Sequence, residues 1–430
     1  MTHPPPVARF FIASINYAPE PTGFAPHAAS LAGYLARQGH QVSVFTGFPF
    51  APYWRRREED RGRLFSRDTA GGLTVYRVTH YIPRRPSSVV QRAAMEASFS
   101  AAVFAAMAAA MLGPAGRPDA VLYIGAQPAV AMMTRIVAAL ARCPYFVNVN
   151  DLAAHAALDV GIVGTRLYKA LDAFEFAAYR KAAGATVLCH SFEEALVTHG
   201  YPRDRIRMIR SPIDIDTIRP VPRDGRFRAR YGIPERAFVV MHAGSMGRKQ
   251  GLMNVVKAAT LARTAGVCWV FVGDGEARHE LEEATQAANL GDVVRYVPFQ
   301  PDDMLSEMFA AADVLLVNQL SSVKDTVIPS KLLTYMAAGR PVLAAVNPGS
   351  QAAEILREAD GGALVAPEDP EALSAAALWF MAQSRESQTA FAERNRAYAE
   401  QHFDERKIVA AHEEFMLKMM GARPASAPAV

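Results

Sequence analysis

The chain has 430 residues, of which half are hydrophobic and a fifth are charged. This composition excludes a disordered or collagen-like chain, and the length favours two domains over one. The net charge is only +4, but residues 1–200 carry 19 basic and 13 acidic side chains, against 27 and 29 in the remainder. The mildly basic first half suits an anionic partner, either a phospholipid surface or a phosphorylated substrate, although a solvated charged face explains the same imbalance.

The cysteines and the N-terminus indicate a reducing compartment. Cys143, Cys189 and Cys268 lie far apart, without disulfide or metal-ligand spacing, so we expect no metal site and a cytoplasmic location. The start MTHPPPVAR lacks the charged-then-apolar order of a signal peptide. No run reaches the roughly 18 apolar residues of a spanning helix. The nearest, residues 97–114, predicts a packed helix, with membrane-surface contact as the alternative.

Apolar strand patterns alternate with helical patterns along the chain. They begin with RFFIASI (9–15) and QVSVFTG (41–47), and a second series begins with FVVMHAG (238–244). Near-continuous apolar strands between helices are typical of parallel sheets covered on both faces. We therefore predict an α/β protein with two doubly wound parallel-sheet domains and a cleft between them. The predicted parts are an N-terminal domain (1–200), a linker region (201–232), a C-terminal domain (233–385), C-terminal helices (386–420) and a disordered tail (421–430).

Ligands of such folds bind in the loops that follow strands, so four of these loops carry the functional hypotheses. The first is NYAPEPTGF (16–24). Helix-start N–H groups attract anions, glycine lets a ligand approach the backbone, and proline stiffens the loop. Thr22 and Gly23 are therefore candidates to face a sugar or phosphate, with a plain strand–turn–helix connection as the alternative.

The second and third loops each combine flexible or helix-start backbone with a cation. HAGSMGRKQG (242–251) surrounds Arg248 and Lys249 with glycines, but has neither Walker-A nor G-x-G-x-x-G spacing. In the segment 327–346, Pro329 and Ser330 mark a helix start. Lys331 then lies in the first helical turn, where the helix dipole opposes a cation, so a bound anion would explain its position. Solvated surface cations are the alternative in both loops.

The fourth loop, 148–161, brings several polar groups to one strand end. They are Asn148, Asn150, Asp151 and His155. Asp151 also fits a helix cap, and His155 also fits an ordinary position on a helix face.

These loops together resemble family 4 retaining glycosyltransferases of the GT-B fold, which consists of two Rossmann-like domains. The closest resemblance is to exopolysaccharide-type members acting in colanic acid and O-antigen assembly. The segments that carry it are NYAPEPTGFAPHAASLAGYLARQGHQVSVFTGFP (16–49), HAGSMGRKQGL (242–252), VFVGDGEARHELE (270–282) and IPSKLLTYMAAGRPVLA (328–344). The resemblance spans about residues 8–415, and the order and spacing of the segments matter more than any one of them.

The resemblance implies roles for individual residues. The N-terminal domain would bind the acceptor, and the C-terminal domain would hold a UDP- or GDP-linked sugar. The C-terminal helices (386–420) would return to the N-terminal domain. Gly23 would lie beneath the donor, Lys249 would bind its diphosphate, and the backbone at Ser330 and Lys331 would meet the phosphates. The strand end around Val297 to Phe299 would meet the base. The further donor-binding candidates are Thr22, Gly244, Ser245, Arg248, Pro329 and Thr334.

Three positions depart from the family pattern. The usual E-x7-E pair is replaced by Thr326 and Thr334, so the sugar and ribose contacts must differ. The family often has a histidine at the position of Asn148. An asparagine side chain cannot titrate, but His155 could supply the missing titratable group. The arginine after the glycine of the second loop is replaced by Ser245, and Arg248 could supply that charge.

The resemblance implies a retaining, metal-independent glycosyltransferase without a cofactor. Lys249, Lys331 and a helix N-terminus would stabilise the leaving diphosphate, and we expect front-face transfer because no carboxylate pair stands out. The catalytic candidates are Asn148, Asp151, His155 and Lys249. The alternatives are a non-catalytic partner protein and, less favoured, a nucleotide-sugar 2-epimerase.

The expected acceptor is a glycan or a polyprenyl-diphosphate-linked glycan, and we expect no nucleic-acid partner. The basic segments YWRRREEDRGR (53–63) and YIPRRPSSVVQR (81–92) suit peripheral contact with an anionic membrane at the inner face of the plasma membrane. A solvated basic loop on a soluble protein is the alternative.

Overall fold

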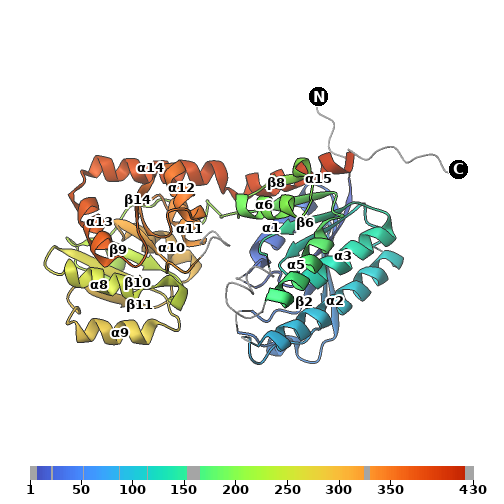
Figure 1. Ribbon diagram of the computed structural model, residues 1–430, viewed down its shortest axis with the longest axis horizontal. Coiled ribbons are helices and arrows are strands. Elements are labelled where there is room, and N and C mark those ends of the chain that lie inside the picture. The colour runs from blue at the N-terminus through green and yellow to red at the C-terminus, as the bar shows by residue number, and fades with distance from the viewer. Residues whose placement is uncertain are drawn as a thin grey trace. The chain divides into compact units, whose positions relative to one another are not determined.

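The computed structural model describes residues 7–421, except Pro21, Thr22, Pro52, Ser87, Pro114 and the ranges 153–164 and 324–329. The chain forms two compact units, residues 1–211 with 406–430, and residues 212–405. Each unit is a sheet with helices on both faces (Figure 1). The predicted α/β fold with two parallel-sheet domains is confirmed.

The sheet of the first unit has the order β3-β4-β2-β1-β5-β6-β7-β8, and all described pairs are parallel except β3 with β4. Strands such as β5, AVLYIG, are buried along their whole length, as expected for a sheet covered on both faces. Its strands are β1 (Arg9–Ala13), β2 (Gln41–Gly47), β3 (Phe65–Ala70), β4 (Leu73–Val78), β5 (Ala120–Gly125), β6 (Tyr145–Val149), β7 (Gly184–Val187) and β8 (Ile206–Met208).

Two apolar clusters cover the faces of this sheet. One is formed with α2, α3, α5 and α6, and the other with α1 and the C-terminal helix α15. The elements are α1 (Ala25–Arg37), η1 (Glu58–Asp60), α2 (Val89–Leu112), α3 (Pro128–Ala141), α5 (Thr165–Tyr179), α6 (His190–Thr198), η2 (Arg203–Arg205) and α15 (Glu405–Gly421). Helix α15 follows the second unit in sequence, but its apolar side chains pack in the core of the first unit.

Helix α2 contains residues 97–112 of the apolar run and begins eight residues before it, at Val89. Met95, Phe99, Val103 and Met107 pack in the core, and the helix contacts α3, β2 and β4. It is also the one described helix that is long and apolar enough to cross a membrane, with 33% of its apolar window buried. Core helices of water-soluble domains share this length and apolar composition, so the two properties are weak evidence for a membrane span.

The sheet of the second unit has the order β11-β10-β9-β12-β13-β14, and all described pairs are parallel. Its strands are β9 (Phe238–Ala243), β10 (Val267–Val272), β11 (Val294–Val297), β12 (Val314–Asn318), β13 (Val342–Ala345) and β14 (Gly362–Val365). Helices α7, α10, α11, α12 and α14 cover one face, and α8, α9 and α13 cover the other. They are α7 (Arg226–Arg230), η3 (Arg248–Gln250), α8 (Met253–Leu261), α9 (Arg278–Ala287), η4 (Asp302–Met304), α10 (Leu305–Ala310), α11 (Ser330–Ala337), α12 (Gln351–Ala359), α13 (Pro370–Ala382) and α14 (Arg385–His402).

The boundaries differ from those expected. Residues 201–232 are not a linker throughout, because β8 pairs with β7 in the first sheet and α7 packs in the second unit, so the units divide at Ser211. The helices at 386–420 do not return together to the first unit. Helix α14 packs on α11 and α12 of the second unit, and the first unit regains the chain only at Arg406. The predicted tail lies outside the described residues from 422 onwards.

Candidate functional site

The loop between β1 and α1 is held in shape by a buried carboxylate. Glu20 is only 4% exposed. Its Oε1 accepts hydrogen bonds from the N–H groups of Phe50 and Ala51, both at 2.7 Å, and its Oε2 accepts one from Asn16 Nδ2 at 2.8 Å. These bonds tie the loop to the segment that follows β2, so its backbone is organised before any ligand binds.

Gly23 ends this loop, with φ at +65°, a conformation that favours glycine. A Cβ there would approach Asn16 Oδ1 at 3.6 Å, an ordinary contact, so the backbone angle matters more than the space. Arg77 Nη2 donates to the carbonyl of Ala18 at 2.6 Å and supports the same loop. Thr22, the other donor-binding candidate of this loop, lies outside the described residues.

Asn148, at the end of β6, is turned into the interior of the first unit and is 1% exposed. Its Nδ2 donates to Thr186 Oγ1 at 3.0 Å and lies 3.4 and 3.5 Å from Nε2 of His27 and His412. Burial lowers the pKa of His27 to about 4 and that of His412 well below its ordinary value, so both rings are neutral at pH 7. The amide is therefore part of a buried polar cluster that joins β6, β7, α1 and α15.

The other candidates near β6 are placed differently. Asn150 Nδ2 donates to the carbonyl of Asn148 at 3.3 Å and is buried. The half-buried Asp151 accepts from the N–H of Leu152 at 2.9 Å. His155 lies outside the described residues, so whether it compensates for Asn148 stays a prediction.

In the second unit, Lys331 joins the start of α11 to the loop after β9. Its ammonium donates to His242 Nε2 at 3.0 Å, to the carbonyl of Ser245 at 3.0 Å and to Gln250 Oε1 at 3.2 Å. An ammonium has three N–H donors, and all three acceptors here are neutral. The loop is thus built around a cation that none of its three contacts neutralises.

Gly244 makes room for this lysine. Its φ is +120°, and a Cβ there would lie 2.7 Å from Lys331 Cε. Burial lowers the pKa of Lys331 to about 8, which leaves it charged at pH 7. Burial, and secondarily the Lys331 charge, lowers the pKa of His242 to about 3, so the imidazole is neutral and accepts from the ammonium. The hydroxyl of Tyr335 pins the same loop by donating to the carbonyl of Ala243 at 3.0 Å and accepting from its N–H at 2.8 Å.

Lys249 and Arg248, in η3, are exposed to solvent. Arg248 lies 3.7 Å from Glu276, and the Glu276 carboxylate also accepts from the N–H of Arg248 at 3.1 Å. The carbonyl of Lys249 accepts from the N–H of Leu320 at 3.1 Å, which fixes the backbone but leaves its side chain exposed. Lys331, and not Arg248, donates to the backbone of Ser245, and Arg248 pairs with Glu276.

Beside Lys331 lies a pocket of about 160 Å³ at the carboxyl edge of the second sheet. Gly244, Phe299, Ser330, Lys331 and Thr334 line it, together with Ala243, Val272, Gln300, Leu305, Met308, Phe309 and Tyr335. The Phe299 ring is 71% exposed and offers a flat apolar surface. Val297 is buried in the core and does not line the pocket, and Pro329 and Thr326 lie outside the described residues.

The structure thus brings together five of the predicted donor-binding residues from three separate loops. Sequence reasoning missed His242, Gln250 and Tyr335, which support Lys331 and its loop, and Glu20, which supports the Gly23 loop. His242 and Gln250 belong to the glycine-rich segment that pointed to this site, but nothing in their spacing indicated a lysine 81 to 89 residues away. Among the described residues, no group of three His, Cys, Asp or Glu side chains could hold a metal ion.

Most of the chain matches known glycosyltransferase families. Residues 224–398 match the family described as glycosyl transferases group 1, and residues 22–212 match a glycosyl transferase 4-like domain. The chain is 25% identical over 408 residues to the putative colanic acid biosynthesis glycosyl transferase WcaI of Escherichia coli, covering 93% of this chain and 98% of that one.

Two solved structures show the same fold. The Anabaena protein HepE, crystallised with UDP, has a TM-score of 0.70 at 16% identity, covering 96% of this chain and 100% of that one. WaaG, a glycosyltransferase involved in lipopolysaccharide biosynthesis, has a TM-score of 0.65 at 18% identity, covering 96% of this chain and 100% of that one.

Proposed function

Because the chain belongs to the group 1 glycosyltransferases and is an enzyme of that class, we propose that it transfers a sugar from a nucleoside diphosphate sugar to a glycan. The proposed acceptor is a surface polysaccharide intermediate, carried on a polyprenyl diphosphate. WcaI, similar over almost the whole chain, is named for colanic acid biosynthesis, and WaaG for lipopolysaccharide biosynthesis, which supports this acceptor class.

The observation that carries the proposal is the Lys331 loop. A half-buried ammonium with only neutral acceptors leaves a positive centre, and a diphosphate would supply the missing negative charge. The first N–H groups of α11 adjoin it, and helix N-termini favour phosphate. Phe299, at the same pocket, offers a ring on which a nucleobase could stack.

The proposed reaction is retaining and uses no metal ion. The bond between the anomeric carbon and the diphosphate oxygen breaks while the acceptor hydroxyl bonds to the same carbon on the same face. The hydroxyl proton passes to the departing phosphate oxygen. Lys331 and Lys249 stabilise the charge that develops on the diphosphate, and such preorganised electrostatic stabilisation usually contributes more to an enzyme's rate enhancement than any other single effect. A trapped glycosyl–enzyme adduct, detected by intact mass, would refute the front-face route.

Asn148 and Asp151 remain proposed catalytic contributors from the first unit. The Asn148 amide is buried among His27, Thr186 and His412, so a direct contact with the sugar would require those side chains to rearrange. We therefore give Lys249 and Lys331 the principal roles.

Binding of nucleoside diphosphates tests the donor site. Thermal unfolding with UDP, GDP and ADP in turn should show selective stabilisation by one of them. A ligand present at 100 times its Kd adds about 2.7 kcal/mol. UDP is the first probe because HepE was crystallised with it. Turnover of the matching UDP- or GDP-sugar with a lipid-linked acceptor completes the test, and NMR of the nucleotide sugar alone would detect epimerisation. If no nucleotide binds, the proposal fails.

We further propose peripheral contact with the cytoplasmic face of an anionic membrane through the two basic segments of the first unit. Arg84 and Arg85 are exposed and have no ion pair among the described residues, and Tyr53 and Val90 are exposed apolar side chains. Each Lys or Arg near an anionic surface contributes about 1 kcal/mol. Flotation with phosphatidylglycerol vesicles at low salt should therefore weaken in Arg84→Glu/Arg85→Glu, whereas a protein that does not float with anionic vesicles contradicts the proposal.

A further inference from the structure

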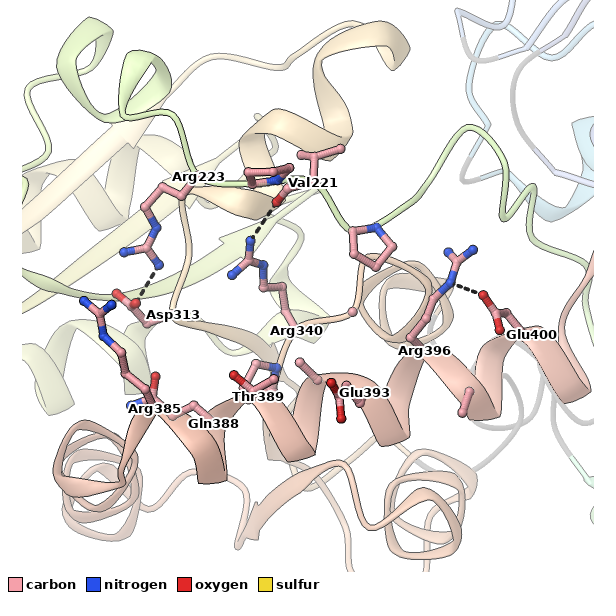
Figure 2. A pocket seen from close by; sticks show the side chains of 16 residues that line it. Val221, Arg223, Asp313, Arg340, Arg385, Gln388, Thr389, Glu393, Arg396 and Glu400 are labelled. Atoms are coloured by element: carbon pink, nitrogen blue, oxygen red, sulfur yellow. Dashed lines mark hydrogen bonds and ion pairs between the residues drawn. The ribbon is translucent and has the colours of Figure 1, made fainter.

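A second hollow in the second unit, about 780 Å³ in volume, lies apart from the Lys331 pocket. Figure 2 shows Arg340 in the middle of it, with Val221 and Arg223 on one side and the residues of α14, from Arg385 to Glu400, on the other. The volume falls within the range of pockets that bind small molecules.

This hollow lies at the opposite edge of the sheet from the proposed donor site. Asp313 and Pro341, which line it, immediately precede β12 and β13 and so mark the amino ends of these strands. Gly244 and Lys331 lie beyond the carboxyl end of β9. Because the described strands of this sheet are all parallel, the two pockets open at opposite ends of it. The proposed glycosyl transfer leaves the hollow unused.

Two of the three acidic side chains that line the hollow, Asp313 and Glu400, form ion pairs with arginines. Asp313 Oδ1 pairs with Arg223 at 2.6 Å, and its Oδ2 pairs with Arg228 at 2.8 Å (Figure 2 shows the first pair). Glu400 pairs with Arg396 at 2.6 Å. In the described part of the chain, Arg340 and Arg385 have no carboxylate partner. Two guanidinium groups therefore border the hollow without a paired counter-charge.

Arg340 is also short of hydrogen-bond acceptors. Its buried Nε has none among the described residues, and its Nη2 reaches the carbonyl of Val221 only at 3.4 Å. Burial, followed by the nearby charge of Arg223, lowers the pKa of Arg340 to about 10, so it stays charged at pH 7. Guanidinium has five donors, and a buried donor without an acceptor is costly. An anion in the hollow would supply both the acceptor oxygens and the charge.

We propose that this hollow is a second ligand site, which binds a phosphate ester carrying hydroxyl groups, with its phosphate between Arg340 and Arg385. Guanidinium forks match the oxygens of phosphate. Thr389 and Glu393, on the same side of α14 as the hollow, offer a hydroxyl and a carboxylate to the hydroxyl groups of the ligand. Glu393, which has no ion pair among the described residues, disfavours a second anionic group at that end. The site is independent of the proposed donor site.

Titration with inorganic phosphate and with ribose 5-phosphate, followed by calorimetry in the presence of saturating UDP, tests this site. Saturating UDP occupies the Lys331 pocket, so the probes cannot bind there. We expect Arg385→Gln to weaken binding of both probes about tenfold or more, as the loss of a charge-assisted contact implies. Arg385 is exposed, so this change leaves the fold intact, and Arg340→Gln should act in the same direction. Arg357→Gln, an exposed change on α12, is the matched control and should have no effect.

Three results would overturn the proposal. The first is no binding of either probe at millimolar concentration. The second is binding that both Arg385→Gln and Arg340→Gln leave unchanged. The third is binding that a titration without UDP detects and that saturating UDP abolishes, which would place the probes in the donor site. Binding that survives UDP and falls in the two variants, but not in Arg357→Gln, supports the second site.

Discussion

Replacing Lys331 by methionine removes the cation around which the loop after β9 is built, while keeping a side chain of similar length. The ammonium makes three hydrogen bonds to neutral acceptors in the free protein, at 3.0 to 3.2 Å. A diphosphate would exchange at least one of them for a hydrogen bond to an anionic oxygen, in which donor and acceptor are both charged. Hydrogen bonds to charged groups contribute about 1.5–3 kcal/mol, and each 1.4 kcal/mol is tenfold in Kd. We therefore expect Lys331→Met to weaken UDP binding by about ten- to a hundredfold.

The pH dependence gives the same residue a separate signature. With its pKa lowered to about 8, Lys331 is charged below that pH and loses its charge above it. The titratable groups that face it are His242, which is neutral throughout this range, and Tyr335, whose hydroxyl is bonded to Ala243 and whose pKa is raised by burial. UDP affinity should consequently fall between about pH 8 and pH 9.5 in the wild type and stay flat in Lys331→Met.

Calorimetry with UDP across this pH range provides the assay, and Lys257→Met, at an exposed lysine of α8, is the matched control. The control should retain wild-type affinity and its alkaline fall. UDP binding to Lys331→Met within twofold of the wild type would refute the reasoning, and would leave the exposed Lys249 as the principal phosphate ligand.

Three further changes test the fold around the proposed site. Gly273→Ala should destabilise the second unit by about 2 kcal/mol or more in a urea titration, because φ is +126° and the new Cβ would overlap the carbonyl of Gly244. The control Gly266→Ala, at φ +85° with open space around the new Cβ, should lower the free energy of unfolding less. Glu20→Gln should lower the melting temperature, since an amide cannot accept all three N–H bonds of that carboxylate, and an unchanged melting curve would contradict its anchoring role. Stability should fall as pH falls from 6.5 toward 4, because the unfolded chain protonates His27 where the folded chain does not. For a pKa of about 4 the contribution of His27 approaches 3 kcal/mol, so His27→Asn should make a plot of melting temperature against pH less steep, while the buried His412 keeps part of the slope.

The sheets could be predicted because their strands carry the signal within themselves. Strand β10 is a continuous apolar run, β9 is apolar except for His242, and both are buried along their full length. The loops that follow such strands were predictable for the same reason, since parallel strands bring their carboxyl ends to one edge. This reasoning found the segment of Gly244 and the position of Lys331, the resemblance added Phe299, and the sheet brings all three to one pocket.

The boundaries could not be predicted, because they depend on contacts between distant residues. Strand β8 is only three residues long and lies in an arginine-rich stretch, so its pattern is too short to distinguish from a linker. Arg396, on α14, donates to the carbonyls of Ile215, Ile218 and Ala337, which fastens that helix to the second unit. The hydrophobic pattern of α14 cannot predict these three hydrogen bonds, because the carbonyls that accept them lie far from Arg396 in the sequence.

The buried polar cluster around Asn148 shows why a single departure from a family pattern is hard to interpret alone. From the sequence, Asn148 stands where the resembled family often has a histidine, which suggests a lost titratable group. In the structure, two neutral histidines, from α1 and α15, lie within 3.5 Å of its amide. A third buried imidazole at position 148 would compete with them for hydrogen bonds, whereas the amide nitrogen has two N–H donors, one for Thr186 and one that is left for His27 or His412. The chemistry of that position therefore depends on His412, 264 residues further along the chain, and the substitution is better understood as part of how α15 docks on the first unit than as the loss of a catalytic group.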